Sequence, residues 1–261
     1  MTRLTGRIAT STIAAAVLVG TLSGCQLVTD QLRQITSNTA TQAPEPKGVV
    51  SDSQPAAATG TGDYFSVVGT AQRAYPATKG QIGYCPLDSL HRPVCAYGEL
   101  TDRPHDGQRE PITINPPGWA HNTSVTIPAL PGVSDSKSYK GYFWNRSHLL
   151  ADSLGGAASA QNLVTGTRTQ NVGSTQRSGQ YDGGMAHGEL LARQYLDSGA
   201  GATCPLYYAA TPVYTGTELI PRTIIVDIQS CDKKLDERIE VSNTASGFDI
   251  DYRTGAFAAK K

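Results

Sequence analysis

The stretch YFWNRSHLLADSLGG, residues 142–156, joins an aromatic run to an arginine, a histidine and a loop of small residues. Its aromatic and leucine residues favour a strand that enters a hydrophobic interior. Interiors seldom hold arginine or charged histidine, because these groups lose their hydration when they are buried. Arg146 and His148 therefore indicate either a surface position or a functional site at the end of the strand, and the flanking sequence distinguishes the two.

The whole chain has 261 residues, 39% hydrophobic and 17% charged, with a formal net charge of zero at pH 7. This length allows one good-sized core with residues left over for a tail. Many nucleic-acid-binding proteins are strongly basic, which this chain is not. A polyanionic partner would therefore have to bind to a local cluster of basic residues.

The N-terminus has the pattern of an export signal. The cationic start MTRLTGR precedes the apolar run IATSTIAAAVLVGTL, which is too short for a comfortable membrane span, and residues 1–24 are predicted to be a signal peptide. The run ends in LSGC, which resembles the lipobox of bacterial lipoproteins and implies that Cys25 is lipidated. The alternative is an ordinary secretory signal with an unrelated cysteine. The predicted location is outside the cell, either lipid-anchored on the outer face of the bacterial cell membrane or released.

Residues 25–62 are expected to form the lipidated N-terminus and a tether. They are rich in Thr, Ser, Ala, Pro and Gln and hold few large apolar residues. Such a composition buries too little surface to offset the entropy lost on ordering. The folded domain is therefore predicted to span residues 63–261.

Four further cysteines remain in the exported domain, and an even number suggests two disulfides with three alternative pairings. Cys85 and Cys95 enclose a short loop. Cys204 and Cys231 flank two β-rich runs with the turn TGTE (215–218) midway between them, so an antiparallel hairpin would bring them face to face. We predict the pairs Cys85–Cys95 and Cys204–Cys231. A zinc site is the alternative, although the spacings fit no common ligand pattern.

The order of predicted elements defines the fold class. Strands are expected in residues 124–130, 140–150, 206–216 and 222–230, and an amphipathic helix in residues 183–199. Strands followed by a loop and helix, and then by more strands, indicate an α+β fold with a mainly antiparallel sheet. The sequence does not decide whether residues 232–261 form strands or a loosely packed tail.

Asn-Arg-Ser-His at 145–148, followed by LLADSLGG and by QNLVTGTRTQNVG (161–173), resembles a known family. The pattern is similar to that of the secreted DNA/RNA non-specific endonucleases of the ββα-metal (His-Me finger) superfamily, in the DNA-entry nuclease and streptodornase-like branch. The family signature is Asp-Arg-Gly-His or a variant of it, and this chain departs from it at the first and third positions, as some secreted members of the branch do. The resemblance covers about residues 97–231, including TPVYTGTELIPR (211–222), and implies a ββα-metal motif.

The resemblance assigns His148 as the general base that deprotonates the attacking water, a role suited to a side chain with a pKa near neutrality. It assigns Asn171 as the metal ligand, through its amide oxygen, and Asn162 as a supporting residue. The expected ion is Mg²⁺, with Mn²⁺ as the alternative, since hard dications keep most of their waters and need few protein oxygens. Asn171 could alternatively serve as a turn or capping residue.

The remaining catalytic and binding roles also follow from the resemblance. Glu189 would hold waters of the metal shell, although a solvated helix charge is the alternative. Phosphate groups would be bound by three arginines, because a guanidinium group suits bidentate contacts with phosphate oxygens. These are Arg146, Arg168 and Arg222. Asn145 stands where the family commonly has aspartate, and its amide accepts hydrogen bonds without carrying a charge.

Charge and aromatic content predict how a substrate is held. Residues 137–222 contain seven Lys/Arg against five Asp/Glu, so binding is expected to be modest, salt-sensitive and directed to backbone phosphates. Tyr142 and Trp144 are expected in the core rather than stacked on bases.

The sequence thus predicts an exported, metal-dependent endonuclease acting on DNA, with RNA as a second candidate substrate and no evident obligate protein partner. One alternative is a surface lipoprotein that binds nucleic acid with a decayed site, which the presence of His148, Asn171 and Arg146 argues against. A wall-associated adhesin is another, for which the motif would be a coincidence.

Overall fold

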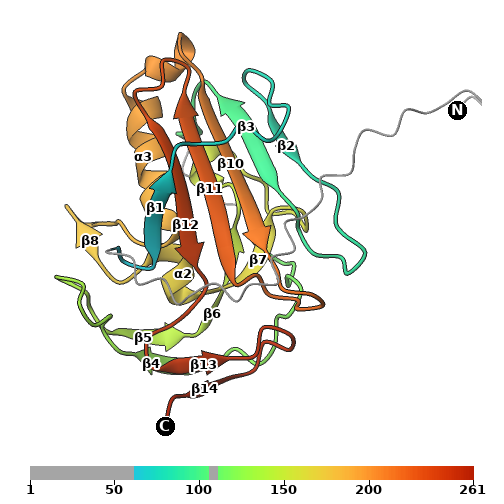
Figure 1. Cartoon of the computed structure of the whole chain (residues 1–261), viewed down its shortest axis with the longest axis vertical. Helices are drawn as coiled ribbons and strands as arrows, with labels where there is room; N and C mark the ends of the chain where they lie inside the picture. The colour runs from blue at the N-terminus through green and yellow to red at the C-terminus, as the bar shows by residue number, and fades with distance from the viewer. Residues whose placement is uncertain (1–61, 106–110) are drawn as a thin grey trace, which may run out of the picture. The chain divides into compact units, whose positions relative to one another are not determined.

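The computed structural model describes residues 62–105 and 111–261. Its central element is a six-stranded antiparallel sheet with the strand order β1-β12-β11-β10-β3-β2 (Figure 1). The strands are β1 (Phe65–Gly69), β2 (Ile82–Tyr84), β3 (Ala96–Leu100), β10 (Leu206–Val213), β11 (Thr223–Ser230) and β12 (Asp236–Ser242). The predicted α+β class is confirmed.

The predictions for the N-terminal part fall mostly outside this description. Three predictions lie outside the described residues: the signal peptide 1–24, the lipidation of Cys25 and nearly all of the tether. They remain untested. The boundary of the predicted 63–261 domain is untested as well. Within the described ranges, no helix has the length and apolarity needed to cross a membrane.

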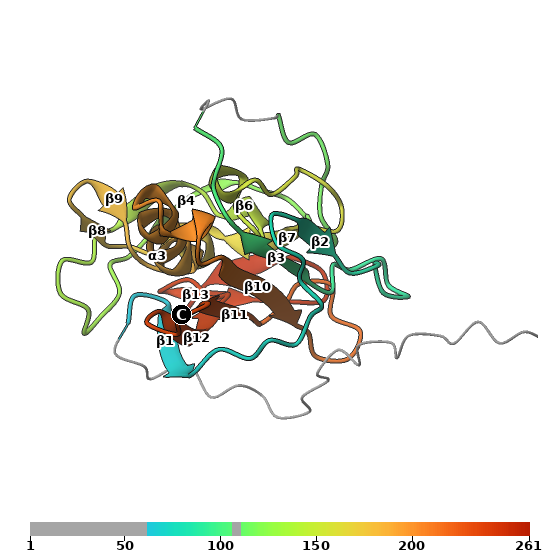
Figure 2. The same cartoon turned by 90° about the horizontal axis from the view of Figure 1, so that it is seen from above.

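The predicted hairpin forms the middle of the sheet. β10 and β11 pair from Leu206↔Ser230 to Val213↔Thr223. Both strands are nearly continuous runs of buried residues, as expected for strands covered on both faces. One face is covered by the helix α3 (Met185–Asp197) and the hairpin of β6 and β7 (Figure 2). Across the other face runs the segment after β1, where the Gln72 N–H donates to Asp227 (2.8 Å).

The ββα motif consists of β6 (Trp144–His148), β7 (Leu163–Thr167) and the short helix α2 (Arg168–Val172). β6 and β7 are antiparallel, and His148 lies opposite Leu163. Thr167 caps α2 by accepting a hydrogen bond from the N–H of Gln170 (2.9 Å). The motif implied by the family resemblance is therefore present.

The prediction of a single strand across residues 140–150 is wrong. The chain forms β5 (Tyr139–Tyr142), which pairs with β4 (Ser124–Ile127), and bends at Phe143 before β6 begins. The bend moves Tyr142 out of the core, so the residue is 63% exposed and its predicted burial is also wrong. Trp144 is buried as predicted, and its indole N–H donates to the carbonyl of Gly255 (3.0 Å).

The C-terminal segment is structured. After β12, it forms β13 (Phe248–Ile250) and β14 (Phe257–Ala259), which build a second, smaller core with Phe143 and Trp144. Phe143 stacks on Phe257 with 3.9 Å between the ring centroids.

The remaining short elements are η1 (Asp152–Leu154), β8 (Gln176–Arg177), β9 (Gln180–Tyr181) and η2 (Ala200–Ala202).

Both predicted disulfides are confirmed. Cys85 and Cys95 close the loop between β2 and β3, with 5.1 Å between their Cα atoms. Cys204 and Cys231 join the open end of the β10–β11 hairpin, with Cα atoms 5.2 Å apart. One bond thus lies at the edge of the sheet, and the other joins its two central strands.

Candidate active site

A pocket of about 550 Å³ lies where the ββα motif meets α3. Arg146 and His148 of β6, Asn171 of α2 and Glu189 of α3 all line it. The two β6 residues are two positions apart and therefore face the same side of the strand. The structure thus brings together four of the predicted site residues from three separate elements.

Asn162 supports the backbone immediately after His148. Its buried side chain accepts a hydrogen bond from the Leu150 N–H (2.9 Å) and donates to the carbonyls of Leu150 and Ala157 (2.9 Å each). Its own carbonyl accepts from the Leu149 N–H (2.8 Å). Asn162 therefore fixes the turn that ends β6 and does not itself line the pocket.

Tyr208 of β10 supports the same turn from the sheet. Its hydroxyl donates to the carbonyl of Leu149 at 3.4 Å, directly after His148. Complete burial raises the pKa of Tyr208 well above its ordinary value, because the phenolate would lose its hydration. The ring therefore stays neutral over the working pH range and remains a hydrogen-bond donor.

Asn171 is held from the strand side by a residue of the motif itself. The hydroxyl of Ser147 donates to Oδ1 of Asn171 at 3.0 Å, and Ser147 is fully buried. Asn171 thus contacts β6 through Ser147 and also lines the pocket.

Asp63 fastens α2 to α3. Its buried carboxylate accepts hydrogen bonds from the backbone and hydroxyl groups of Ser174 and Thr175, just after α2, at 2.5–2.9 Å. Its carbonyl accepts from the N–H of Gly184, which caps α3 (2.8 Å). Gly184 has φ 53°, and a Cβ there would clash with the carbonyl oxygen of Gln170, so the junction requires glycine. The elements that carry Asn171 and Glu189 are thereby kept at a fixed spacing.

Arg146 is oriented by two residues that the sequence did not single out. Its Nε and Nη2 groups donate to Oδ1 of Asn115 at 3.1 and 2.6 Å. Its guanidinium lies 4.6 Å from the ring centroid of Trp119, a cation–π distance. Both contacts hold the guanidinium at the pocket, whose lining includes Arg146.

Arg168 lies beside the pocket rather than in its lining. Its guanidinium lies between the rings of Tyr139 (5.0 Å) and Tyr181 (4.7 Å). Tyr181 lines the pocket from β9. The stack connects α2 to the short β8–β9 hairpin at the rim.

Besides Asn162 and Arg168, two further predicted site residues, Arg222 and Asn145, do not line the pocket. Arg222 donates to both carboxylate oxygens of Glu218 (2.8 and 2.6 Å) and lies over the ring of Tyr252. Its hydrogen bond with Glu218 raises the pKa of Arg222, which keeps this pair charged and joined. Asn145 faces Gly166 across the β6–β7 pair and is likewise absent from the pocket lining. Arg222 is thus paired with Glu218, and its predicted contact with phosphate stays a prediction.

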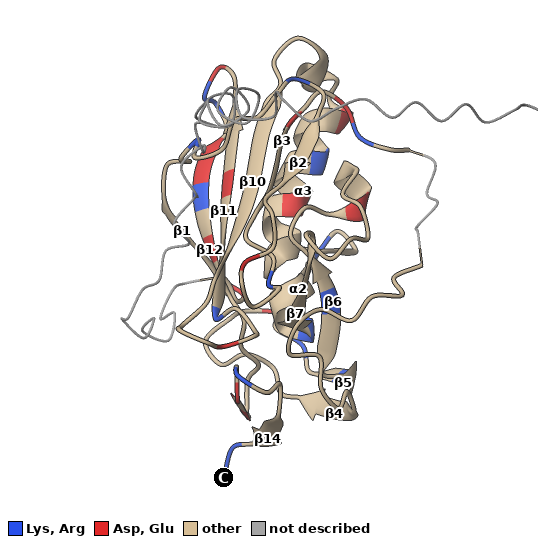
Figure 3. Ribbon diagram, turned by 90° about the vertical axis from the view of Figure 1, so that its right-hand side faces the viewer, with Lys and Arg blue, Asp and Glu red and all other residues tan. Residues whose placement is uncertain are grey.

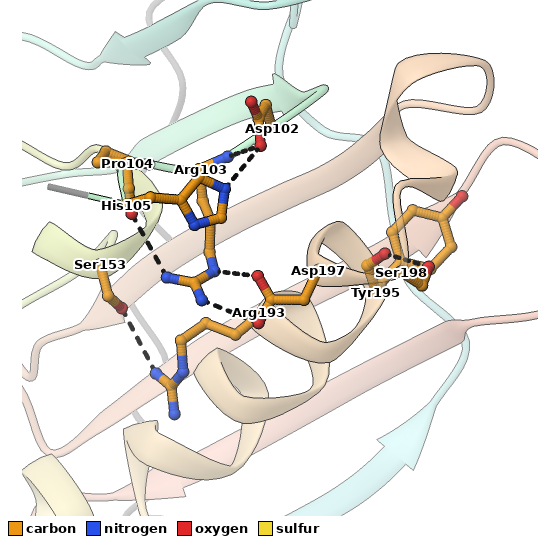
Figure 4. A network of polar contacts seen from close by, with 9 residues as sticks. All are labelled: Asp102, Arg103, Pro104, His105, Ser153, Arg193, Tyr195, Asp197 and Ser198. Carbon is orange, nitrogen blue, oxygen red and sulfur yellow. Dashed lines mark hydrogen bonds and ion pairs between the residues drawn. The ribbon is translucent and has the colours of Figure 1, made fainter.

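Two arginines that the sequence analysis did not single out, Arg193 and Arg103, lie on and next to α3. Arg193 lies 3.6 Å from Glu189 and donates to the hydroxyl of Ser153 (3.4 Å), while Arg103 donates to both oxygens of Asp197 (2.5 and 2.9 Å; Figure 4). That bidentate contact lowers the pKa of Asp197. In Figure 3, acidic and basic segments alternate around α3. Residues of both charge signs therefore lie on and around this helix.

The donor groups of the pocket fit a hard dication. Among residues 62–105 and 111–261, no group of three or more His, Cys, Asp or Glu side chains is placed to hold a metal by itself. The pocket instead presents an amide oxygen from Asn171 and carboxylates from Asp152 and Glu189. Oxygen ligands that leave several waters in place are what Mg²⁺ and Mn²⁺ prefer.

The matching family model is that of the DNA/RNA non-specific endonucleases, over residues 72–232. This is more than half of the chain, and the chain belongs to this family. The family resemblance seen in the sequence is confirmed, and the pocket lies in the motif that carried it.

The individual relatives are streptococcal nucleases. A deoxyribonuclease of Streptococcus dysgalactiae subsp. equisimilis is 30% identical over 243 residues, covering 74% of this chain and 72% of the relative. The Sda1 nuclease, solved with a bound zinc ion, is 30% identical with a TM-score of 0.63 and covers 76% of this chain and 97% of that chain. NucA of Streptococcus agalactiae, with bound magnesium, shares the fold at 24% identity and a TM-score of 0.56, covering 73% and 84%.

Substituting Asp63→Asn should destabilise the domain by about 2–4 kcal/mol, because an amide nitrogen cannot accept from the N–H and O–H donors around it. Chemical denaturation of the purified protein measures the change. Asp249→Asn, at an exposed position whose ion pair with Lys260 spans 3.9 Å, should change stability by less than about 0.5 kcal/mol. Equal effects of the two substitutions would contradict the assigned role of Asp63.

Replacing Asn162 by alanine should lower the free energy of unfolding by about 3 kcal/mol, since it removes three buried hydrogen bonds and leaves backbone groups unpaired. Activity per folded molecule should also fall, because the backbone after His148 loses its support. Thermal unfolding and activity at a temperature where the variant remains folded measure the two effects separately. A stable variant with normal activity would rule out this supporting role.

Proposed function

We propose that this protein is an exported, metal-dependent endonuclease that hydrolyses phosphodiester bonds of DNA, with RNA as a second substrate. The observation that carries the proposal is the convergence of His148 and Asn171, which are separated by 22 residues in the sequence, on one pocket with Arg146 and Glu189. A histidine can act as the general base, and an amide oxygen, a guanidinium and a carboxylate can hold a metal ion, its waters and a phosphate oxygen.

Each group has a role that its surroundings support. His148 takes the proton from the attacking water, and the turn fixed by Asn162 holds its backbone in place. Arg146, oriented by Asn115 and Trp119, binds a phosphate oxygen next to the scissile bond. Glu189 orders water in the metal shell.

The proposed ion is Mg²⁺, with Mn²⁺ as the alternative, held by Oδ1 of Asn171 and by water. A dication bound there polarises the scissile phosphate and stabilises the leaving oxygen. The oxygen donors of the pocket favour these ions over zinc, which prefers nitrogen and sulfur ligands. Bound magnesium in NucA and zinc in Sda1 are consistent with a divalent cation in proteins of this fold.

The proposed location follows from the N-terminal sequence. A signal peptide over residues 1–24 and lipidation of Cys25 would anchor the enzyme on the outer face of the cell membrane, or cleavage would release it. The two disulfides support an oxidising location, because such bonds rarely persist in reducing cytosol.

His148→Ala should reduce cleavage of plasmid DNA by about 10²-fold or more in the presence of Mg²⁺, because the water loses its base. EDTA should stop the wild-type enzyme. The control is His121→Ala, an exposed histidine outside the pocket, which should digest plasmid at the wild-type rate. Undiminished digestion by His148→Ala would reject the assigned base. A wild-type protein that binds DNA without cutting it would favour the alternative of a binding lipoprotein.

Arg146→Gln should lower kcat/KM by about 10–100-fold and reduce the salt dependence of substrate binding by about one charge, because one phosphate contact is lost. Arg222→Gln should leave kcat/KM within about twofold and should lower stability instead, since its guanidinium is engaged by Glu218. Steady-state kinetics at several salt concentrations separate the two variants. A larger kinetic loss for Arg222→Gln would restore it as a phosphate ligand.

A further inference from the structure

The third position of the motif is occupied by a serine, where the family signature has glycine. Ser147 is fully buried, and its hydroxyl donates to Oδ1 of Asn171 at 3.0 Å. Glycine offers no side-chain hydrogen-bond donor at this position. The serine therefore adds a contact to the very atom proposed to bind the metal.

An asparagine amide presents two different ends, an acceptor oxygen and an NH₂ group that only donates. Rotation by 180° about the last side-chain bond would exchange them and offer the cation a nitrogen that cannot ligate it. In the observed arrangement the Ser147 hydrogen is used by Oδ1, which keeps a second lone pair for a cation. With the amide reversed, the Ser147 oxygen could accept from the NH₂ group, but its own hydrogen would then be buried without this acceptor, so the observed orientation is favoured.

We propose that Ser147 is a positioning residue that holds the amide oxygen of Asn171 toward the metal. This inference rests on the proposed function, because it requires Asn171 to be the ligand. Ser147 itself contacts α2 and does not line the pocket, so it acts through Asn171 alone. Hydrogen bonds from residues behind a metal ligand commonly set the orientation of that ligand.

The close packing of α2 on the β6–β7 hairpin makes the contact possible. A Cβ added at Gly166 of β7 would lie 2.9 Å from Cβ of Ser147 and would clash with Oε1 of Gln170. The absence of that atom lets α2 approach until a side chain as short as serine reaches Asn171. Cysteine, a weak donor of similar size, is the conservative replacement at this position.

The test measures Mn²⁺ affinity without substrate, by electron paramagnetic resonance or calorimetry on the whole purified protein. Ser147→Ala should weaken Mn²⁺ binding by about 10-fold or more, and Ser147→Cys should be intermediate. In an Asn171→Asp background both carboxylate oxygens can ligate, so the orientation no longer matters. Adding Ser147→Ala to that background should then change the dissociation constant by less than about twofold.

Ser230→Ala is the matched control, because Ser230 is also fully buried on a strand and also donates to a side-chain oxygen, that of Asp232 (2.6 Å). It should leave Mn²⁺ affinity unchanged. If Ser147→Ala lowers Mn²⁺ affinity equally in the wild-type and the Asn171→Asp backgrounds, the loss is a general packing effect and the inference is overturned. If Ser147→Ala does not fold, unchanged Mn²⁺ affinity in Ser147→Cys would overturn it as well.

The Mn²⁺ affinity of Asn171→Ala distinguishes failure of the proposed function from failure of this inference. If Asn171→Ala binds Mn²⁺ as tightly as the wild type, Asn171 is not the ligand and the proposed function loses its metal site. If Asn171→Ala weakens binding while Ser147→Ala does not, the site stands and the role of Ser147 is rejected.

Discussion

The contact between α2 and its neighbours is the constraint on which the active site depends. α2 has five residues, too few to be stable alone, and its position comes from the surrounding chain. Thr167 caps it, Ser147 contacts it from the strand, and Asp63 binds the residues that follow it. The placement of Asn171 is therefore a tertiary property, with one determinant more than a hundred residues away in the sequence.

Sequence reasoning succeeded where the signal is local. The β10–β11 hairpin, the helix α3 and both disulfides follow from turn residues, periodicity and spacing near each element. The ββα motif followed from the family resemblance. The site residues that line the pocket, His148 and Asn171 among them, belong to the same short blocks.

The wrong strand prediction and the contacts that were not predicted have physical causes that no local sequence pattern encodes. Residues 140–150 read as one continuous strand-like run, but Asn122 binds both the N–H and the carbonyl of Trp144 (2.8 Å each), where the new strand β6 begins. The pairing of Arg222 with Glu218, four residues before it, was likewise not foreseen from the sequence. Nothing around Asp63 in the sequence predicts its partners, because they are set by packing of distant segments.

The β8–β9 hairpin lies between two fixed points. It connects the end of α2 to the start of α3, and Asp63 fastens the chain on both sides of it, at Ser174 and at Gly184. Its turn, at Ser178 and Gly179, reaches the surface. An insertion or deletion at this tip would leave both anchored ends of the hairpin in place. The number of residues between Asn171 and Glu189 can therefore change among homologous nucleases while the two helices that carry them keep their contacts with Asp63.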